Sequence, residues 1–186
     1  VSVARYLRRS GIDASFVDSR ANPPGIDALR ASWPDAEVTL GELRLPDNVS
    51  RIIVSPGVAD SEPLLKKARK ANIEIVSDIE LFAREAKAPF VAITGSNGKS
   101  TVTTLPYHMG RAAGKVTLAG GNLGEPALDL LDPQPPDLDV HELSSFQLQR
   151  TQSLPAAVAV LLNVSPDHPG LTASGREQPH ANDQAY

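Results

Sequence analysis

A glycine-rich segment near the middle of the chain contains the residue types best suited to chemistry. It reads Gly95-Ser96-Asn97-Gly98-Lys99-Ser100-Thr101 and directly follows the apolar run Val91-Ala92-Ile93. Glycines let backbone N–H groups turn around phosphate oxygens, and a helix that begins here would add its positive end. Lys99 supplies a positive charge for the β- and γ-phosphates, and Ser100 supplies a hydroxyl for Mg²⁺. We predict that Gly95 to Thr101 bind nucleotide phosphates.

The spacing of this loop differs from the generic phosphate loop. It is G-x-x-G-K-[ST], because Ile93 stands where the longer pattern G-x-x-x-x-G-K-[ST] has its first glycine. The alternative is a glycine-rich turn that binds nothing. Since glycine makes up only about 7% of residues in proteins, the pattern is rare by chance. Its place between a predicted strand and a predicted helix makes that alternative weaker.

Acidic and imidazole side chains follow two other predicted strands. Glu142 lies near the end of the predicted strand 138–143, and Asp167 and His168 follow the predicted strand 156–162. Ligands of open α/β sheets bind at the carboxyl ends of the strands, so we expect Glu142 to reach Mg²⁺ and His168 to lie near the phosphates. Alone, Glu142 would be a cap or an ion-pair partner, and His168 a structural or solvated residue. The other histidines have no such placement and are predicted to be ordinary: His108, His141 and His180.

Short apolar runs alternate with helical periodicity along the chain. We predict strands at 14–17, 51–54, 73–76, 90–93, 115–119, 138–143 and 156–162, and helices at 4–9, 26–33, 63–71, 78–86, 100–113 and 126–131. This alternation predicts an α/β fold with parallel sheets. A Rossmann-like domain, residues 1–87, would precede a P-loop-type mononucleotide-binding domain, residues 88–186, that is incomplete. The run 156–162 is nearly all apolar, which is typical of a strand buried on both faces.

Two strand ends in the first half contain further candidate ligand residues. Asp18 ends a predicted strand, where an acidic residue of a Rossmann unit often binds a ribose hydroxyl. A helix-capping role for the aspartate of Asp18-Ser19-Arg20 fits the pattern equally well. Ser55-Pro56-Gly57 follows the strand 51–54 and predicts a turn whose backbone could contact a ligand.

Composition narrows the class of protein. The chain has 186 residues, a net charge of −4, 41% hydrophobic residues and no cysteine. Mild acidity argues against a nucleic-acid binder, and the absence of cysteine excludes disulfides and thiolate metal sites. No apolar run approaches the roughly 20 residues of a membrane helix, and the N-terminus lacks a secretory signal. We expect a cytoplasmic protein that binds neither membranes nor nucleic acid.

Several segments together resemble the Mur ligases, the ATP-dependent amide-forming enzymes of peptidoglycan synthesis. Besides the loop from Thr94 to Thr101, the similar segments are Ser77-Asp78-Ile79-Glu80-Leu81-Phe82, Gly121-Asn122-Leu123-Gly124, Glu142-Leu143-Ser144-Ser145-Phe146-Gln147-Leu148 and Asn163-Val164-Ser165-Pro166-Asp167-His168. The resemblance covers about residues 2–168. Its Glu142-to-Leu148 string points to the ligases that join D-glutamate to UDP-N-acetylmuramoyl-L-alanine.

The resemblance implies a role for each candidate residue. Asp18, Ser19 and Arg20 would lie at the uracil, and Ser55, Pro56 and Gly57 would line the UDP cleft. Asn122 would approach the pyrophosphate of the substrate, with Ser144 and Gln147 nearby. Gly95 to Thr101 would hold ATP. Ser100 and Glu142 would bind one Mg²⁺ and His168 a second, so that Lys99, Glu142 and His168 are the implied catalytic residues.

The implied reaction proceeds through an acyl phosphate. The γ-phosphate would pass to the alanyl carboxylate, and the amino group of D-glutamate would then displace phosphate to form the amide. Two alternatives stay open: another P-loop phosphotransferase or NTPase, and an inactive nucleotide-binding fragment. Phosphate release that needs neither UDP-N-acetylmuramoyl-L-alanine nor D-glutamate would exclude the ligase.

The sequence also departs from the family pattern. The chain begins after the family's first glycine-rich loop, has no lysine after Lys115, and does not match the family across 169–186. Pro106 falls inside the predicted loop-following helix, and His141 replaces an apolar strand residue. We therefore expect part of a three-domain enzyme that lacks the C-terminal acceptor domain, is a monomer, and makes no amide on its own.

Overall fold

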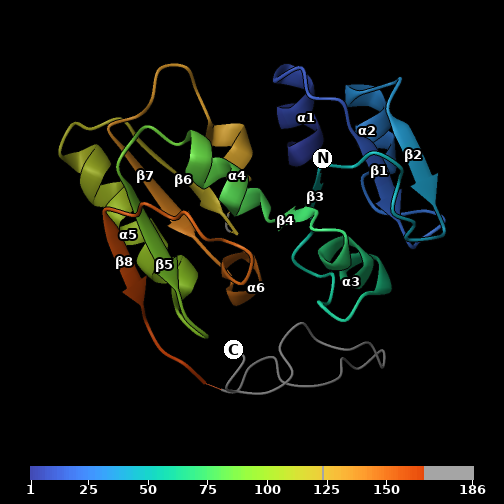
Figure 1. Cartoon of the computed structure of the whole chain (residues 1–186). Coiled ribbons are helices and arrows are strands. Elements are labelled where there is room, and N and C mark those ends of the chain that lie inside the picture. The colour runs from blue at the N-terminus through green and yellow to red at the C-terminus, as the bar shows by residue number, and fades with distance from the viewer. Residues whose placement is uncertain (123, 166–186) are drawn as a thin grey trace. The chain divides into compact units, whose positions relative to one another are not determined.

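The chain folds into two compact units, seen in a computed structural model that describes residues 1–122 and 124–165 (Figure 1). The first unit contains Val1–Ile52 and Glu62–Ile75. The second contains Ile53–Ser61 and the chain from Val76 onward. Both are mixed α/β structures, as predicted from the alternation of strands and helices. The predicted domain boundary after Lys87 stays a prediction.

The first unit is built around a parallel strand pair. Its elements are α1 (Ser2–Arg9), β1 (Ser15–Asp18), α2 (Ile26–Ser32), β2 (Glu37–Leu40), β3 (Arg51–Ile53), α3 (Pro63–Lys70) and β4 (Glu74–Val76), the last residues of β3 and β4 clustering with the second unit. β1 pairs with β2 from Ser15↔Glu37 to Asp18↔Leu40, and β3 pairs with β4. Sequence analysis missed β2, because Glu37 and Thr39 interrupt the apolar run that marked the other short strands.

The second unit contains a four-stranded parallel sheet in the order β6-β7-β5-β8. Its elements are α4 (Asp78–Glu85), β5 (Phe90–Thr94), α5 (Lys99–Ala112), β6 (Thr117–Gly121), the 3₁₀ helix η1 (Ala127–Leu130), β7 (Leu138–Glu142), α6 (Ser145–Leu148) and β8 (Val158–Leu161). Because all four strands run the same way, their carboxyl ends meet at one edge. Gly121 of β6 and Ile93 of β5 both pair with Glu142 of β7, so the predicted loop and carboxylate lie at that edge.

Two elements of the second unit differ from prediction. β8 was expected to be buried on both faces, but it pairs only with β5 among the described strands, and Val158 and Leu161 are 51% and 64% exposed. The apolar run 156–162 therefore predicted a strand correctly, but it did not predict how exposed that strand is. The predicted helix 126–131 is the short η1, flanked by Pro126 and a proline-rich loop.

Pro106 lies inside α5 without ending it. A proline has no N–H to donate to the carbonyl four residues earlier, so the helix loses one hydrogen bond at Val102. Despite this missing hydrogen bond, the helix extends from Lys99 to Ala112.

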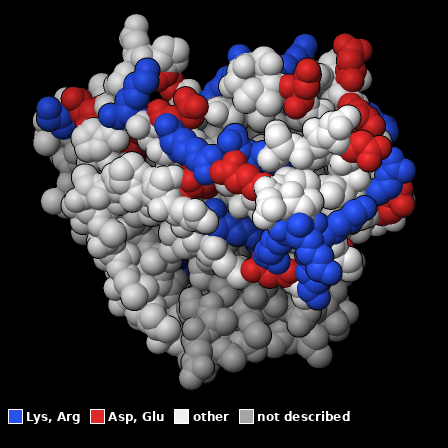
Figure 2. Space-filling view, viewed as in Figure 1, with Lys and Arg blue, Asp and Glu red and all other residues white. Residues whose placement is uncertain are grey.

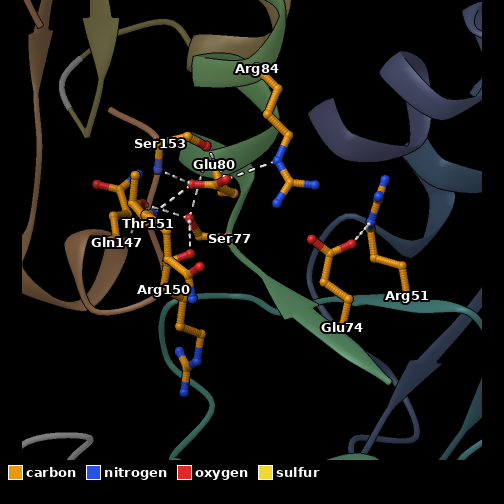
Figure 3. Close-up of polar contacts among 10 residues, drawn as sticks. Arg51, Glu74, Ser77, Glu80, Arg84, Gln147, Arg150, Thr151 and Ser153 are labelled. Atoms are coloured by element: carbon orange, nitrogen blue, oxygen red, sulfur yellow. Dashed lines mark hydrogen bonds and ion pairs between the residues drawn. The ribbon is translucent and has the colours of Figure 1, made fainter. Parts of the chain in front are cut away.

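A buried glutamate joins α4 to the segment after α6 (Figure 3). Glu80 is 1% exposed and accepts hydrogen bonds from the backbone N–H of Gln152 (2.7 Å) and Ser153 (3.0 Å) and from the Ser153 hydroxyl. Arg84 Nε donates to it at 2.8 Å. Burial alone would raise the pKa of Glu80, but these donors hold the pKa at about 2. The carboxylate therefore stays charged and fixes the chain at residues 152–153.

His141, which sequence analysis predicted to be an ordinary histidine without a functional role, is buried in the core. It is 1% exposed, and its ring lies 4.4 Å from that of Phe82 and 5.9 Å from that of Phe90. Neither ring nitrogen has a hydrogen-bond partner among the described residues. Burial lowers the pKa of His141 to about 4, so the imidazole is neutral and costs stability as an unsatisfied polar group.

Acidic and basic side chains are interspersed on the face shown in Figure 2. Among the described residues, no helix has both the length and the apolar character needed to cross a lipid bilayer.

Replacing Glu80 by Gln is expected to destabilise the fold at pH 7 by roughly 2 kcal/mol. The folded pKa of about 2 lies below the ordinary 4.5, so the stabilisation is present above pH 4.5 and is lost as pH falls toward 2. Urea unfolding from pH 7 to pH 2.5 should show the difference between Glu80→Gln and wild type shrinking with acidity. Glu85→Gln, an exposed change on the same helix, is the control. A difference that is independent of pH would contradict the role given to the Glu80 charge.

Replacing His141 by Leu is expected to stabilise the fold by about 1–2 kcal/mol at pH 7, because it removes an unsatisfied polar group from an apolar site. The folded pKa of about 4 lies below the ordinary 6.5, so the unfolded wild-type chain takes up the proton first. The advantage of His141→Leu should therefore widen as pH falls from 6.5 toward 4. Thermal unfolding across this range measures it, with the exposed His108→Leu as control. A lower melting temperature at every pH would show that the imidazole is needed for packing.

Candidate functional site

The glycine-rich loop lies at the carboxyl end of β5, between its two neighbouring strands. α5 begins within this segment at Lys99, with Gly98 as a left-handed N-cap that offers no side chain to the first turn. Gly95 has a φ of 141°, and a Cβ there would lie 3.1 Å from the backbone N and O of Asn163. Only glycine fits this position, which brings the loop close to the segment after β8.

Asn163 and Ser165 hold the loop from that segment. The Asn163 side chain accepts from Asn97 N–H at 2.8 Å and donates to the Asn97 carbonyl at 2.9 Å. Ser96 Oγ donates to the Ser165 carbonyl and accepts from its N–H. Sequence reasoning did not single out either residue for this support. The only signal was an amide and a hydroxyl just after an apolar strand.

Lys99 rests against its own loop. Its Nζ donates to the carbonyl of Gly95 at 2.7 Å and to that of Ser96 at 3.1 Å. These two contacts hold the ammonium against the backbone of the loop.

Glu142 receives two side chains from different elements. Ser100 Oγ donates to its Oε2 and Asn122 Nδ2 to its Oε1, both at 2.8 Å. Glu142 is only 3% exposed, and the Asn122 N–H also bonds to its carbonyl at 2.8 Å. Gly121 is required for this approach, because a Cβ there would collide with the Glu142 carbonyl. Loop, carboxylate and Asn122 thus form one cluster at the sheet edge.

The donor atoms of this cluster fit Mg²⁺. Ser100 Oγ and Glu142 Oε2 are hard oxygen donors that already lie in contact. Magnesium at nucleotide sites takes one or two protein oxygens and completes its shell with phosphate and water. The described residues contain no group of three or more His, Cys, Asp or Glu that could hold a metal. His168, predicted as a second ligand, lies outside the described residues.

Ser144 and Gln147 form hydrogen bonds with each other at the start of α6. Ser144 Oγ accepts from the Gln147 N–H at 3.3 Å, and Gln147 Oε1 accepts from the Ser144 N–H at 3.0 Å, which forms a capping box at the start of α6. Gln147 is 5% exposed. The pair therefore sets the direction of the chain after Glu142.

The remaining candidates form local turns. Pro56 lies inside a turn closed by Val58 N–H and the Ser55 carbonyl at 3.1 Å, in the second unit. In the first unit, the backbone N–H, Nε and Nη2 of Arg20 all donate to the carboxylate of Asp18 at 2.7–2.9 Å. The Arg20 side chain lowers the pKa of Asp18. Asp18 caps no helix, since α2 begins at Ile26 after Gly25.

Two family descriptions match the chain. "Mur ligase MurD-like, N-terminal domain" matches residues 1–77, and "Mur ligase middle domain" matches residues 93–176. The chain is also similar to proteins named UDP-N-acetylmuramoylalanine--D-glutamate ligase. It is 52% identical over 170 residues to that of Nitrosococcus oceani, 51% to that of Marinobacter nauticus and 52% to that of Pseudomonas aeruginosa.

Each of these alignments covers 90% of this chain and 38% of the relative, so the chain spans well under half the length of these proteins. A pseudomurein peptide ligase type C from Methanothermus fervidus aligns with a TM-score of 0.45 at 20% identity, over 100% of this chain and 38% of that one. Because the two domain matches stand in order and the relatives are about half identical in sequence, the chain belongs to the Mur ligase family.

Proposed function

We propose that the chain is the substrate-activating part of a ligase that adds D-glutamate to UDP-N-acetylmuramoyl-L-alanine with ATP in peptidoglycan synthesis. The observation that carries the proposal is the cluster of Lys99, Ser100, Glu142 and Asn122 at one sheet edge. The names of relatives at about 50% identity support the choice of substrates. A Rossmann-like domain at 1–87, a P-loop-type domain at 88–186, a cytoplasmic location and a monomer belong to the same proposal.

The cluster suits the transfer of a phosphoryl group. Loop N–H groups and the start of α5 would hold the β- and γ-phosphates of ATP, and Lys99 would offset their charge. Ser100 and Glu142 would hold Mg²⁺, which supplies charge neutralisation for the transferring group. Asn122, tied to Glu142, would place the UDP-substrate beside that group. The chain's contribution is thus orientation and electrostatic stabilisation.

The chemistry proposed has two stages. The alanyl carboxylate of UDP-N-acetylmuramoyl-L-alanine attacks the γ-phosphorus, ADP leaves, and an acyl phosphate results. The amino group of D-glutamate then attacks the acyl carbon through a tetrahedral intermediate and displaces inorganic phosphate. Turn 55–58 and Asp18 to Arg20 would bind the UDP part, and His168 would assist a second Mg²⁺.

Replacing Lys99 by Ala is expected to weaken ATP binding by at least about tenfold, because a charge-assisted contact to phosphate is lost. Isothermal titration calorimetry of the 186-residue chain with ATP and Mg²⁺ measures the dissociation constant. Lys115→Ala is the control, since Lys115 is exposed and its Nζ forms a 3.7 Å ion pair with Asp137. If Lys99→Ala and wild type bound ATP with equal affinity, the loop would not be part of the nucleotide site.

The full reaction is tested in a chimera in which this chain replaces the 170 matched residues of the Nitrosococcus oceani relative. We expect phosphate release only when ATP, UDP-N-acetylmuramoyl-L-alanine and D-glutamate are all present. In the same chimera Glu142→Gln should lower turnover by at least about a hundredfold, because it removes a metal-binding charge. Phosphate release from ATP alone at the full rate would instead identify an NTPase.

A further inference from the structure

The segment from Ser77 to Phe82 resembles the family but has no role in the proposed chemistry. Its polar residues Ser77 and Glu80 nevertheless form several hydrogen bonds. Ser77 caps α4 by accepting from Glu80 N–H at 3.1 Å. Its hydroxyl also lies 2.9 Å from that of Thr151 and 3.4 Å from the carbonyl of Arg150 (Figure 3). Glu80 accepts hydrogen bonds from the backbone N–H groups of Gln152 and Ser153, which follow Thr151 in the chain. The segment therefore fixes the backbone of residues 150–153.

The residue that this backbone presents is a buried arginine. Arg150 is 7% exposed, and its Nη2 donates to the carbonyl of Val58 at 2.7 Å and to Asp60 Oδ1 at 2.8 Å. The neighbouring Gln149 Nε2 donates to Asp60 Oδ2 at 3.2 Å. Residues 149 and 150 thus hold the turn that begins at Ser55, from a position just after the α6 capping box.

Stability alone does not account for this arginine. Its Nε and Nη1 are buried without a hydrogen-bond partner among the described residues, and an incompletely paired buried charge costs more than an apolar side chain of similar length. Asp60 is 39% exposed, so water can solvate it if the arginine is removed. A side chain that costs stability but fixes a neighbouring turn indicates a role in positioning.

We propose that Arg150 is a positioning residue that latches the turn 55–58 to α6, and so holds the surface that receives the UDP-linked substrate. Ser77 and Glu80 set the position of Arg150 by binding the backbone of residues 150–153. The latch joins two predicted substrate segments, the turn at Ser55 and the Ser144–Gln147 capping box, within the second unit. Its link to the substrate rests on the proposed function, whereas the contact itself does not.

The latch is tested by hydrogen exchange on the 186-residue chain, in wild type, Arg150→Met and Arg150→Lys. We expect the amides of 54–61 to exchange at least about fivefold faster in Arg150→Met, with the loop 95–101 unchanged. Arg150→Lys keeps one donor and should lie between the two. The melting temperature of Arg150→Met should stay within about 3 °C of wild type, since the change exchanges a costly polar group for an apolar one. Arg111→Met, an exposed arginine over Tyr107, is the matched control.

Titration with two ligands then separates the latch from the proposed function. We expect Arg150→Met to bind UDP-N-acetylmuramoyl-L-alanine at least about tenfold more weakly, while its affinity for ATP stays within about twofold. Unchanged exchange at 54–61, or equal acceleration at 95–101, would overturn the latch. Unchanged substrate affinity despite a loosened turn would overturn its role in binding. If wild type binds ATP but not the UDP-substrate, the proposed function fails, and the exchange result still decides the latch.

Discussion

The parallel register of β6, β7 and β5 is the constraint on which the candidate site depends. Glu142 can meet Ser100 and Asn122 only because Gly121 and Ile93 both stand opposite it. A slip of one residue would turn Glu142 to the other face of the sheet. Three segments that are far apart in sequence therefore depend on one row of strand pairing.

Around this sheet, charged and polar side chains determine where the loops lie. Glu80 binds residues 152–153, Arg150 holds residues 58–60, and Asn163 supports the phosphate loop. Each of these contacts joins a side chain to backbone groups of a distant segment. Loops are positioned in this way because their backbone groups need partners that no strand or helix supplies. The hydrophobic core fixes the elements, and these polar contacts fix the surfaces that would meet ligands.

Sequence reasoning predicted the elements better than the contacts. The loop at Gly95 and the strand before it could be predicted, because glycine spacing and an apolar run are local signals. The pattern Ser-x-x-Glu at Ser77 resembles a capping box, but Glu80 turns instead to residues 152–153, which lie about 70 positions away in sequence. The burial of His141 and the exposure of β8 also depend on which neighbours tertiary packing supplies. Only non-local geometry decides such features.

Lys99 helps to hold the shape of its own loop. Its ammonium donates to the carbonyls of Gly95 and Ser96, so these contacts order the backbone of the loop. Under the proposed function, nucleotide binding would exchange these two acceptors of the Lys99 ammonium for phosphate oxygens. The enthalpy of that exchange is a small difference between two strong interactions. Under the proposed function, discrimination between nucleotides would come from groups other than the phosphate that Lys99 would contact.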